Sequence, residues 1–176
     1  IKNGKKSKMK VNNQVLSTPI GFFESSNISN FKSPCRLTHF TREHFDKYVE
    51  GFPFLHTIND LFKELTPDRY DNQFKQASEQ PKFQIDNTAF STVTINRNFR
   101  TALHKDANDF EKGFGNLIIL EQGKYSGGYT IFPQYGVAID LRQNDFVVMD
   151  VHQWHANTKI YESESDIEYN KDIISD

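Results

Sequence analysis

The sequence predicts an α+β fold, with helices in the first half and an antiparallel β core in the second. Between residues 41 and 80, apolar side chains recur at the three- and four-residue spacing of amphipathic helices. From residue 83 onward, short runs rich in β-branched and aromatic residues alternate with turn-forming segments such as KGFG and GKYSGG. Closely spaced strands of this kind favour a sandwich or barrel, so we expect helices packed on one face of a jelly roll.

The size and composition suit one domain with a core of ordinary size. The chain has 176 residues, and its 16 phenylalanines can each bury a large area. The formal charge of −2 excludes a uniformly basic nucleic-acid binder but leaves room for a local basic patch. A single cysteine, Cys35, excludes an internal disulfide, and no apolar run reaches membrane-spanning length. These features predict an intracellular protein, in the nucleus or the cytoplasm, without a membrane partner.

Residues 1–33 are expected to form a basic, irregular N-terminal arm. Half of the first ten residues are lysine, and residues 11–33 are polar with short apolar islands typical of irregular chain or an edge strand. We expect a single domain over residues 34–176, with a helical part at about 41–80 and a β core at about 83–160. The acidic segment YESESDIEYNKDIISD is expected to be a loop, which leaves the core without a closing strand.

The helical part is predicted to contain at least two helices. Thr41 is a suitable N-cap for the first, whose apolar face consists of Phe45, Tyr48, Val49 and Phe52. Pro53 interrupts the pattern because proline cannot continue a helix. Thr57 and Asp60 resemble a capping box at the start of the second helix, and Pro67 either ends that helix or starts a further one. The second helix has its apolar face at Ile58, Leu61, Phe62 and Leu65.

The β core is predicted from five short runs separated by turn chemistry. Each run is rich in β-branched and aromatic residues, which favour strands. The runs are AFSTVTIN, NLIILEQ, GGYTIF, GVAIDL and DFVVMDV.

A possible metal site follows the first of these strands. On an extended segment, residues two apart point to the same face, so His104 and Asp106 can present an imidazole and a carboxylate together. A third ligand is available after the last strand, where His152 and His155 are the candidates. Two histidines and one carboxylate on one face, with open positions opposite, form the metal site of non-heme Fe(II) oxygenases.

Three segments resemble the TET and base-J-binding-protein (thymine hydroxylase) superfamily of 2-oxoglutarate/Fe(II)-dependent dioxygenases. They are FSTVTINRNFRTALHKDANDF, GFGNLIILE and YSGGYTIFPQYGVAIDLRQNDFVVMDVHQWHANT. The resemblance implies a double-stranded β-helix (cupin-like) core that holds Fe(II) through His104, Asp106 and a distal histidine. The family's distal ligand lies in a segment like HATT or HGTT, which matches HANT and selects His155. The implied co-substrates are 2-oxoglutarate and O₂.

The resemblance also implies a substrate, the 5-methyl group of thymine or 5-methylcytosine in DNA. The family places a base-contacting polar residue three positions after the ligand aspartate, which corresponds to Asp109, with Asn108 beside it. Trp154 is a candidate wall of the base pocket, and Asn96 and Arg100 are candidate co-substrate contacts. The family's arginine anchor for 2-oxoglutarate is not found after His155, where Lys159 and Lys171 are the only cations, so the anchor stays unidentified.

Two other functions remain open from the sequence. The near-neutral charge fits an Fe(II)/2-oxoglutarate hydroxylase that acts on a protein, an RNA or a small molecule, because DNA binding relies on neutralising phosphates. A non-catalytic β-sandwich binding module would leave the two histidines and the aspartate unrelated. The sequence indicates no protein partner and does not distinguish thymine from 5-methylcytosine.

Overall fold

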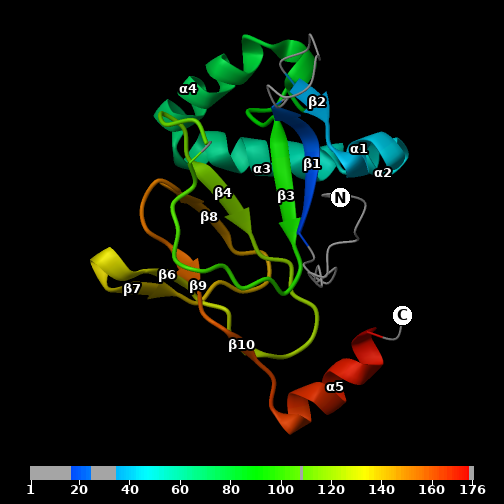
Figure 1. Cartoon of the computed structure of the whole chain (residues 1–176), viewed down its shortest axis with the longest axis vertical. Helices are drawn as coiled ribbons and strands as arrows, with labels where there is room; N and C mark the ends of the chain where they lie inside the picture. Colours follow the sequence, from blue (N-terminus) through cyan, green and yellow to red (C-terminus); the bar gives the residue numbers. More distant parts are fainter. Residues whose placement is uncertain (1–16, 25–34, 108, 175–176) are drawn as a thin grey trace, which may run out of the picture.

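The computed structural model describes residues 17–24, 35–107 and 109–174. It has mixed helix and strand content, with several small antiparallel sheets (Figure 1). Among these residues, no helix is long and apolar enough to cross a membrane. The lysine-rich first ten residues and Asn108 lie outside the described part, so the expectations about them are not addressed by the structure.

Four helices between residues 39 and 78 gather at one end of the molecule (Figure 1). They are α1 (His39–Glu43), α2 (Phe45–Glu50), α3 (Phe52–Leu65) and α4 (Pro67–Ser78), followed by the short helix η1 (Pro81–Phe83). The N-cap assigned to Thr41 is wrong. Thr38 caps α1, because its side-chain oxygen accepts a hydrogen bond from the Thr41 N–H, and Thr41 is buried inside the helix.

Pro53 lies at a break between two helices, as predicted, since α2 ends at Glu50 and α3 begins at Phe52. It lies in the first turn of α3, where the missing N–H costs nothing because that position has no intrahelical acceptor. The predicted capping box is therefore wrong as well. Thr57 lies inside α3, and its hydroxyl donates to the Pro53 carbonyl one turn earlier, at 3.1 Å. Pro67 starts α4, the second of the two alternatives left open by the sequence.

The first sheet joins the N-terminal segment to the β core. Strand β1 (Ser17–Glu24) lies between β2 (Cys35–Leu37) and β3 (Thr92–Asn96) and is antiparallel to both. The segment expected to be irregular or an edge strand thus contains the central strand of this sheet. Gly21 on β1 has φ +96°, and a Cβ there would lie 2.4 Å from the Ser91 carbonyl oxygen, so only glycine fits.

The remaining strands of the described residues form three further antiparallel sheets, and all five predicted runs contain strands. β4 (Gly115–Ile118) pairs with β8 (Phe146–Met149). β6 (Thr130–Phe132) lies between β7 (Val137–Ile139) and β9 (Ala156–Asn157), with the short helix η2 (Pro133–Tyr135) joining β6 to β7. β5 (Ser126–Gly127) pairs with β10 (Ile160–Tyr161).

The last segment is a helix, so the prediction of a loop is wrong. α5 (Glu164–Ile174) lies at the end of the molecule opposite to the other helices (Figure 1). Ser163 precedes it and exchanges hydrogen bonds with Asp166, which satisfies N–H groups at the start of the helix. Asn170 fixes α5 to the chain before β5, since its side chain bonds both the N–H and the C=O of Lys124.

The main core lies where the helices meet the sheets. Phe62 of α3 is fully buried, and its ring packs edge-on against Tyr70 of α4 and stacks with Phe90. Partly buried side chains from β4 and β8, among them Ile118 and Val148, pack against this cluster. The helices thereby support the sheet from which the chain continues into the segment of residues 150–155 that carries the candidate site.

Candidate metal centre

Backbone hydrogen bonds hold residues 104–106 against the chain that follows β8. The N–H of His104 donates to the carbonyl of His155, and the N–H of His155 donates to the carbonyl of His104, both at 3.0 Å. The N–H of Asp106 donates to the carbonyl of Val151, also at 3.0 Å. Two segments far apart in the sequence are thus fixed side by side, next to the edge of β9.

This pairing brings three of the predicted residues together. The ligand atoms of His104, Asp106 and His155 all lie within 4.8 Å of one another. Asp106 Oδ1 is 3.1 Å from His104 Nε2 and 4.0 Å from His155 Nε2. The His155 side chain is only 8% exposed, whereas those of the other two are about one-third exposed. The cluster therefore has a buried base and an open side.

The ring orientations fit a bound metal ion. His104 Nδ1 lies 2.7 Å from the Ala102 carbonyl oxygen, and His155 Nδ1 lies 2.9 Å from the Gln153 carbonyl oxygen. Since a carbonyl can only accept, each Nδ1 carries the proton and donates it. In the neutral ring, each Nε2 then has a free lone pair, and both Nε2 atoms face Asp106. Histidine ligands of metals are usually oriented by such a second hydrogen bond.

His152, the other candidate ligand, lies outside the cluster and connects two loops. Its Nδ1 is 3.1 Å from Asp150 Oδ1, and its Nε2 is 3.2 Å from the Asp109 carbonyl oxygen. The Gln153 side-chain amide and the His152 N–H, which both donate to Asp150, lower the pKa of that carboxyl. Burial raises the pKa of the Asp109 carboxyl, and the adjacent Asp106 carboxylate raises it further.

The structure does not bring every predicted site residue to the cluster. Asn96 is the last residue of β3 and is exposed. Trp154 and Arg100 lie on other surfaces: the Trp154 ring is 46% exposed beside Lys105, and Arg100 lines a cavity that contains none of the three clustered residues. Lys171, one of the two cations after His155, pairs with Glu168 on α5.

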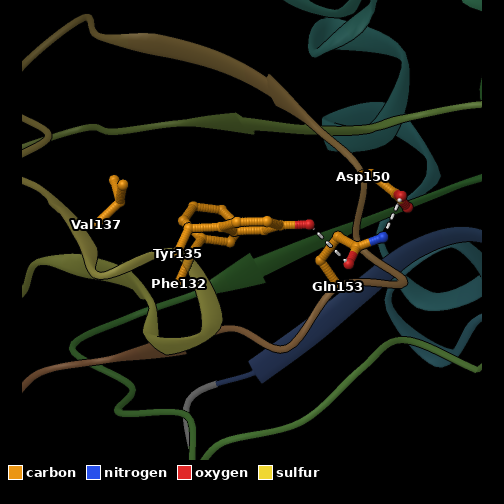
Figure 2. A pocket seen from close by; sticks show the side chains of 5 residues that line it. All are labelled: Phe132, Tyr135, Val137, Asp150 and Gln153. Atoms are coloured by element: carbon orange, nitrogen blue, oxygen red, sulfur yellow. Dashed lines mark hydrogen bonds between the residues drawn. The ribbon is translucent and has the colours of Figure 1, made fainter.

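A cavity of about 370 Å³ adjoins the cluster through Phe132. The Phe132 ring lies 6.3 Å from the His155 ring and also lines the cavity, together with Tyr135, Val137, Asp150 and Gln153. Figure 2 shows the Tyr135 hydroxyl pointing at Gln153, whose amide in turn points at Asp150. The cavity has aromatic walls on one side and a hydrogen-bonded amide and carboxylate on the other.

One family match shows how this chain is related to known proteins. Residues 19–172 match the Tet_JBP family, described as the oxygenase domain of the 2OGFeDO superfamily. The chain belongs to this family. The superfamily uses Fe(II), 2-oxoglutarate and O₂, for which the His-Asp-His cluster of this Tet_JBP domain has a suitable donor set.

Several curated proteins are similar to this Tet_JBP domain. Thymine dioxygenase JBP1 of Trypanosoma brucei brucei is 34% identical over 137 residues, which cover 78% of this chain and 16% of that protein. The bifunctional helicase and thymine dioxygenase JBP2 of the same organism (strain 927/4 GUTat10.1) is 34% identical over 146 residues, which cover 82% of this chain and 13% of that protein. Thymine dioxygenase JBP1 of Leishmania infantum is 31% identical over 145 residues, which cover 82% of this chain and 17% of that protein. The chain spans less than a fifth of the length of these relatives.

Some residues near the candidate metal centre of this Tet_JBP domain were not predicted from the sequence. Thr101 donates to the Asn157 side chain at 2.6 Å, and Asn157 donates to Thr130 at 3.3 Å, forming a polar row next to the two histidines. Phe132 was missed as a neighbour of His155. The alternation of the run GGYTIF places Thr130 and Phe132 on one face, but only the pairing of β6 with β9 shows that this face carries the histidines.

Proposed function

We propose that this domain hydroxylates the 5-methyl group of thymine in DNA, using Fe(II), 2-oxoglutarate and O₂. The cluster of His104, Asp106 and His155 in a chain of the Tet_JBP family is the observation that carries the proposal. The names of the relatives, thymine dioxygenases JBP1 and JBP2, favour thymine over 5-methylcytosine. Because this chain spans only a small part of those proteins, its own activity has to be measured directly.

In the proposed reaction, the three clustered residues hold Fe(II) and leave the open side for the co-substrates. The bound metal, with 2-oxoglutarate and O₂, would supply the oxidising power. The protein supplies orientation: the carbonyls of Ala102 and Gln153 keep both Nε2 atoms pointing at the metal position. Burial of His155 keeps water away from one side of the centre.

The target base would be contacted from the loop that follows Asp106. We assign Asp109 as a polar contact to the base, because its carboxyl lies beside that of the candidate ligand Asp106. The cavity beside Phe132 offers aromatic walls against which an extruded pyrimidine can stack. The co-substrate roles of Asn96 and Arg100 stay predictions. Arg100 lines a cavity together with Thr101 and Asn157, which lie next to the two histidines.

We also propose that the small sheets belong to one double-stranded β-helix. The antiparallel pairing of β4 with β8 and of β6 with β7 and β9, together with the family match, supports this. Within the described residues only β1 and β6 are paired on both sides, so β3 and β4, like the other edge strands, leave room for further pairing. On this proposal residues 34–176 form a single domain, with β1 of the preceding segment added to its sheet.

The proposal is tested by product formation on three matched oligonucleotides. The three differ only in their pyrimidine bases. The first contains thymine, and the second contains 5-methylcytosine with uracil in place of thymine. The pyrimidines of the third are uracil and unmethylated cytosine. The chain is incubated with Fe(II), 2-oxoglutarate and O₂, and succinate and hydroxymethylated bases are measured by mass spectrometry. We expect products with the first oligonucleotide and none with the third.

A variant and two contrary outcomes complete the test. His104→Ala should lose the product, because a metal site with two donors left holds Fe(II) poorly. If only the oligonucleotide with 5-methylcytosine gave product, the substrate would be 5-methylcytosine and not thymine. Succinate formed to the same extent without DNA would point to a different substrate, and no succinate with Fe(II) bound would favour a binding module.

A further inference from the structure

The strand pair that carries the candidate ligands has a second face. Residues paired across antiparallel strands point to the same face, and successive residues alternate. His104 and His155 are such a pair, and their rings lie 4.3 Å apart. The next residues along each strand therefore point away from the metal position. Lys105 and Trp154 do so and contact one another, with the ammonium 5.4 Å from the indole ring.

A cavity of about 430 Å³ continues this second face beyond Leu103 and Ala156. It is lined by Ile131 and Pro133 and also by Thr101, Ala102 and Asn157. Leu103 alternates with His104, so the Leu103 side of the cavity lies on the face that Lys105 and Trp154 share. We use the name outer surface for the following six residues: Arg100, Leu103, Lys105, Trp154, Lys159 and Tyr161.

The outer surface combines exposed rings with cations. Trp154 is 46% exposed and Tyr161 is 56% exposed, so both rings are accessible to a ligand. A lysine ammonium lies over each ring: Lys105 over Trp154, and Lys159 over Tyr161 at 5.0 Å. Arg100 and Lys159 both line the cavity, and none of the described residues that line it is acidic.

The charge of this surface is opposite to that of the chain. The chain has a formal charge of −2, whereas the outer surface has three cations and no carboxylate among its members. Rings that alternate with cations are the arrangement by which proteins bind nucleic-acid strands, since bases stack on the rings and phosphates pair with the cations. Two of the three cations are lysines, and lysine is depleted at protein–protein interfaces, which favours a nucleic acid over a protein partner.

We propose that the outer surface binds a strand of DNA beside the metal centre, with phosphates at Arg100, Lys105 and Lys159. Bases stack on Trp154 and Tyr161. This inference rests on the proposed function, because it names the surface that holds the DNA on which that reaction would act. Lys105 and Trp154 each adjoin a candidate ligand in the sequence, so a strand held there lies within a few residues' length of the metal position.

The inference is tested by the affinity of the metal-free chain for a fluorescent single-stranded DNA, measured by anisotropy at several salt concentrations. Arg100→Glu with Lys159→Glu should weaken binding about tenfold or more and reduce the salt dependence, because each lost phosphate contact lowers its slope by about 0.7. Trp154→Ala with Tyr161→Ala should weaken binding about tenfold, and Trp154→Phe should keep most of the affinity, because a ring remains for stacking.

A matched control removes a cation and a ring elsewhere. The Arg36 guanidinium lies 6.0 Å from the exposed ring of Phe23, on β2 and β1. In Figure 1, β2 lies beside the helices, at the end of the molecule away from β10, which carries Tyr161. Arg36→Ala with Phe23→Ala should leave the affinity within about twofold. Equal losses in this control and in the outer-surface variants would overturn the inference. No DNA binding by the wild-type chain, or binding unchanged in every variant, would also overturn it.

Failure of the inference and failure of the proposed function have different results. If the function is right and the surface is wrong, the chain oxidises thymine, and the outer-surface variants bind DNA as tightly as the wild type. If the surface is right and the function is wrong, the wild type binds DNA through these residues but forms no hydroxymethylated base. Binding of an acidic peptide as tight as that of DNA, and equally lost in the variants, would contradict DNA as the ligand.

Discussion

Gly115 of β4 is a position where one added methyl group would disturb the segment that carries the candidate ligands. A Cβ at Gly115 would lie 2.1 Å from Cγ1 of Val151, far inside van der Waals contact. Val151 is buried, and its carbonyl accepts the hydrogen bond from the N–H of Asp106. The small residue in β4 therefore decides how closely the ligand segment approaches the sheet.

We predict that Gly115→Ala destabilises the domain by about 1–3 kcal/mol, the usual cost of overpacking a core. Urea unfolding of the variant and the wild type measures this difference. Val151→Ala provides the matched partner, because removal of its γ-methyl groups makes room for the new one. The double variant should be less destabilised than the sum of the two single variants, and strict additivity would contradict the proposed clash.

The two histidines of the segment HQWH should differ sharply in metal binding. His155 points its free Nε2 at Asp106, whereas both ring nitrogens of His152 lie next to oxygen atoms of Asp150 and Asp109. We predict that His155→Ala weakens the binding of Co²⁺, a redox-stable substitute for Fe(II), by about a hundredfold or more. His152→Ala should have a much smaller effect. Titration followed by the cobalt absorption measures both, and the reverse order would exclude His155 as a ligand.

At the scale of elements, α3 and α4 form the support on which the β core rests. The Phe62 ring has no exposed surface and contacts aromatic rings from α4 and from the chain before β3. We predict that Phe62→Ala costs about 3–5 kcal/mol of unfolding free energy, as expected when a large buried ring leaves a cavity. Leu65→Ala is the control on the same helix, since Leu65 is 57% exposed and its loss should change stability by about 0.5 kcal/mol or less. Chemical denaturation distinguishes the two.

The position of α5 depends on one buried side chain. Asn170 is 6% exposed, and its amide bonds the N–H and C=O of Lys124 as well as the Glu162 carboxylate. We predict that Asn170→Ala frees α5 from the chain before β5, because three hydrogen bonds are lost together. Faster hydrogen exchange over residues 164–174 measures this, with a cost of about 1–3 kcal/mol. Glu168→Gln, a change at an exposed position of α5, should leave exchange unaltered.

At the scale of the whole molecule, a metal ion would connect the two halves of the β core. The candidate ligands come from the segment after β3 and from the segment after β8. A ligand that binds only the folded state stabilises it by about 2.7 kcal/mol at a concentration 100 times its Kd. We therefore predict that Co²⁺ or Mn²⁺ raises the melting temperature by about 5–10 °C.

The melting temperature should return to its starting value when a chelator is added. Asp106→Asn should remove most of the increase, because the amide is a weaker ligand than the carboxylate. An equal increase in wild type and in this variant would indicate that the metal binds elsewhere.

The helices and strands were largely predictable because their signals are local. Apolar spacing indicated the helical part, and the β-branched runs indicated β3, β4, β6, β7 and β8. The wrong predictions concern segments whose structure depends on a contact with a distant part of the chain. Thr38 caps α1, and Thr41, also bonded to the N–H of Gly21, is drawn into the interior. α5 was missed because its apolar residues are few and one buried asparagine, Asn170, fixes it.

The sequence by itself determined which residues are available as ligands, His104, Asp106 and the two histidines of HQWH, because residue type and a two-residue spacing are local properties. Only the tertiary structure decided how they meet. The exchange of hydrogen bonds between His104 and His155 places both Nε2 atoms at Asp106 and, by strand alternation, turns Lys105 and Trp154 to the opposite face. That pairing joins segments distant along the chain, so no local pattern specifies it.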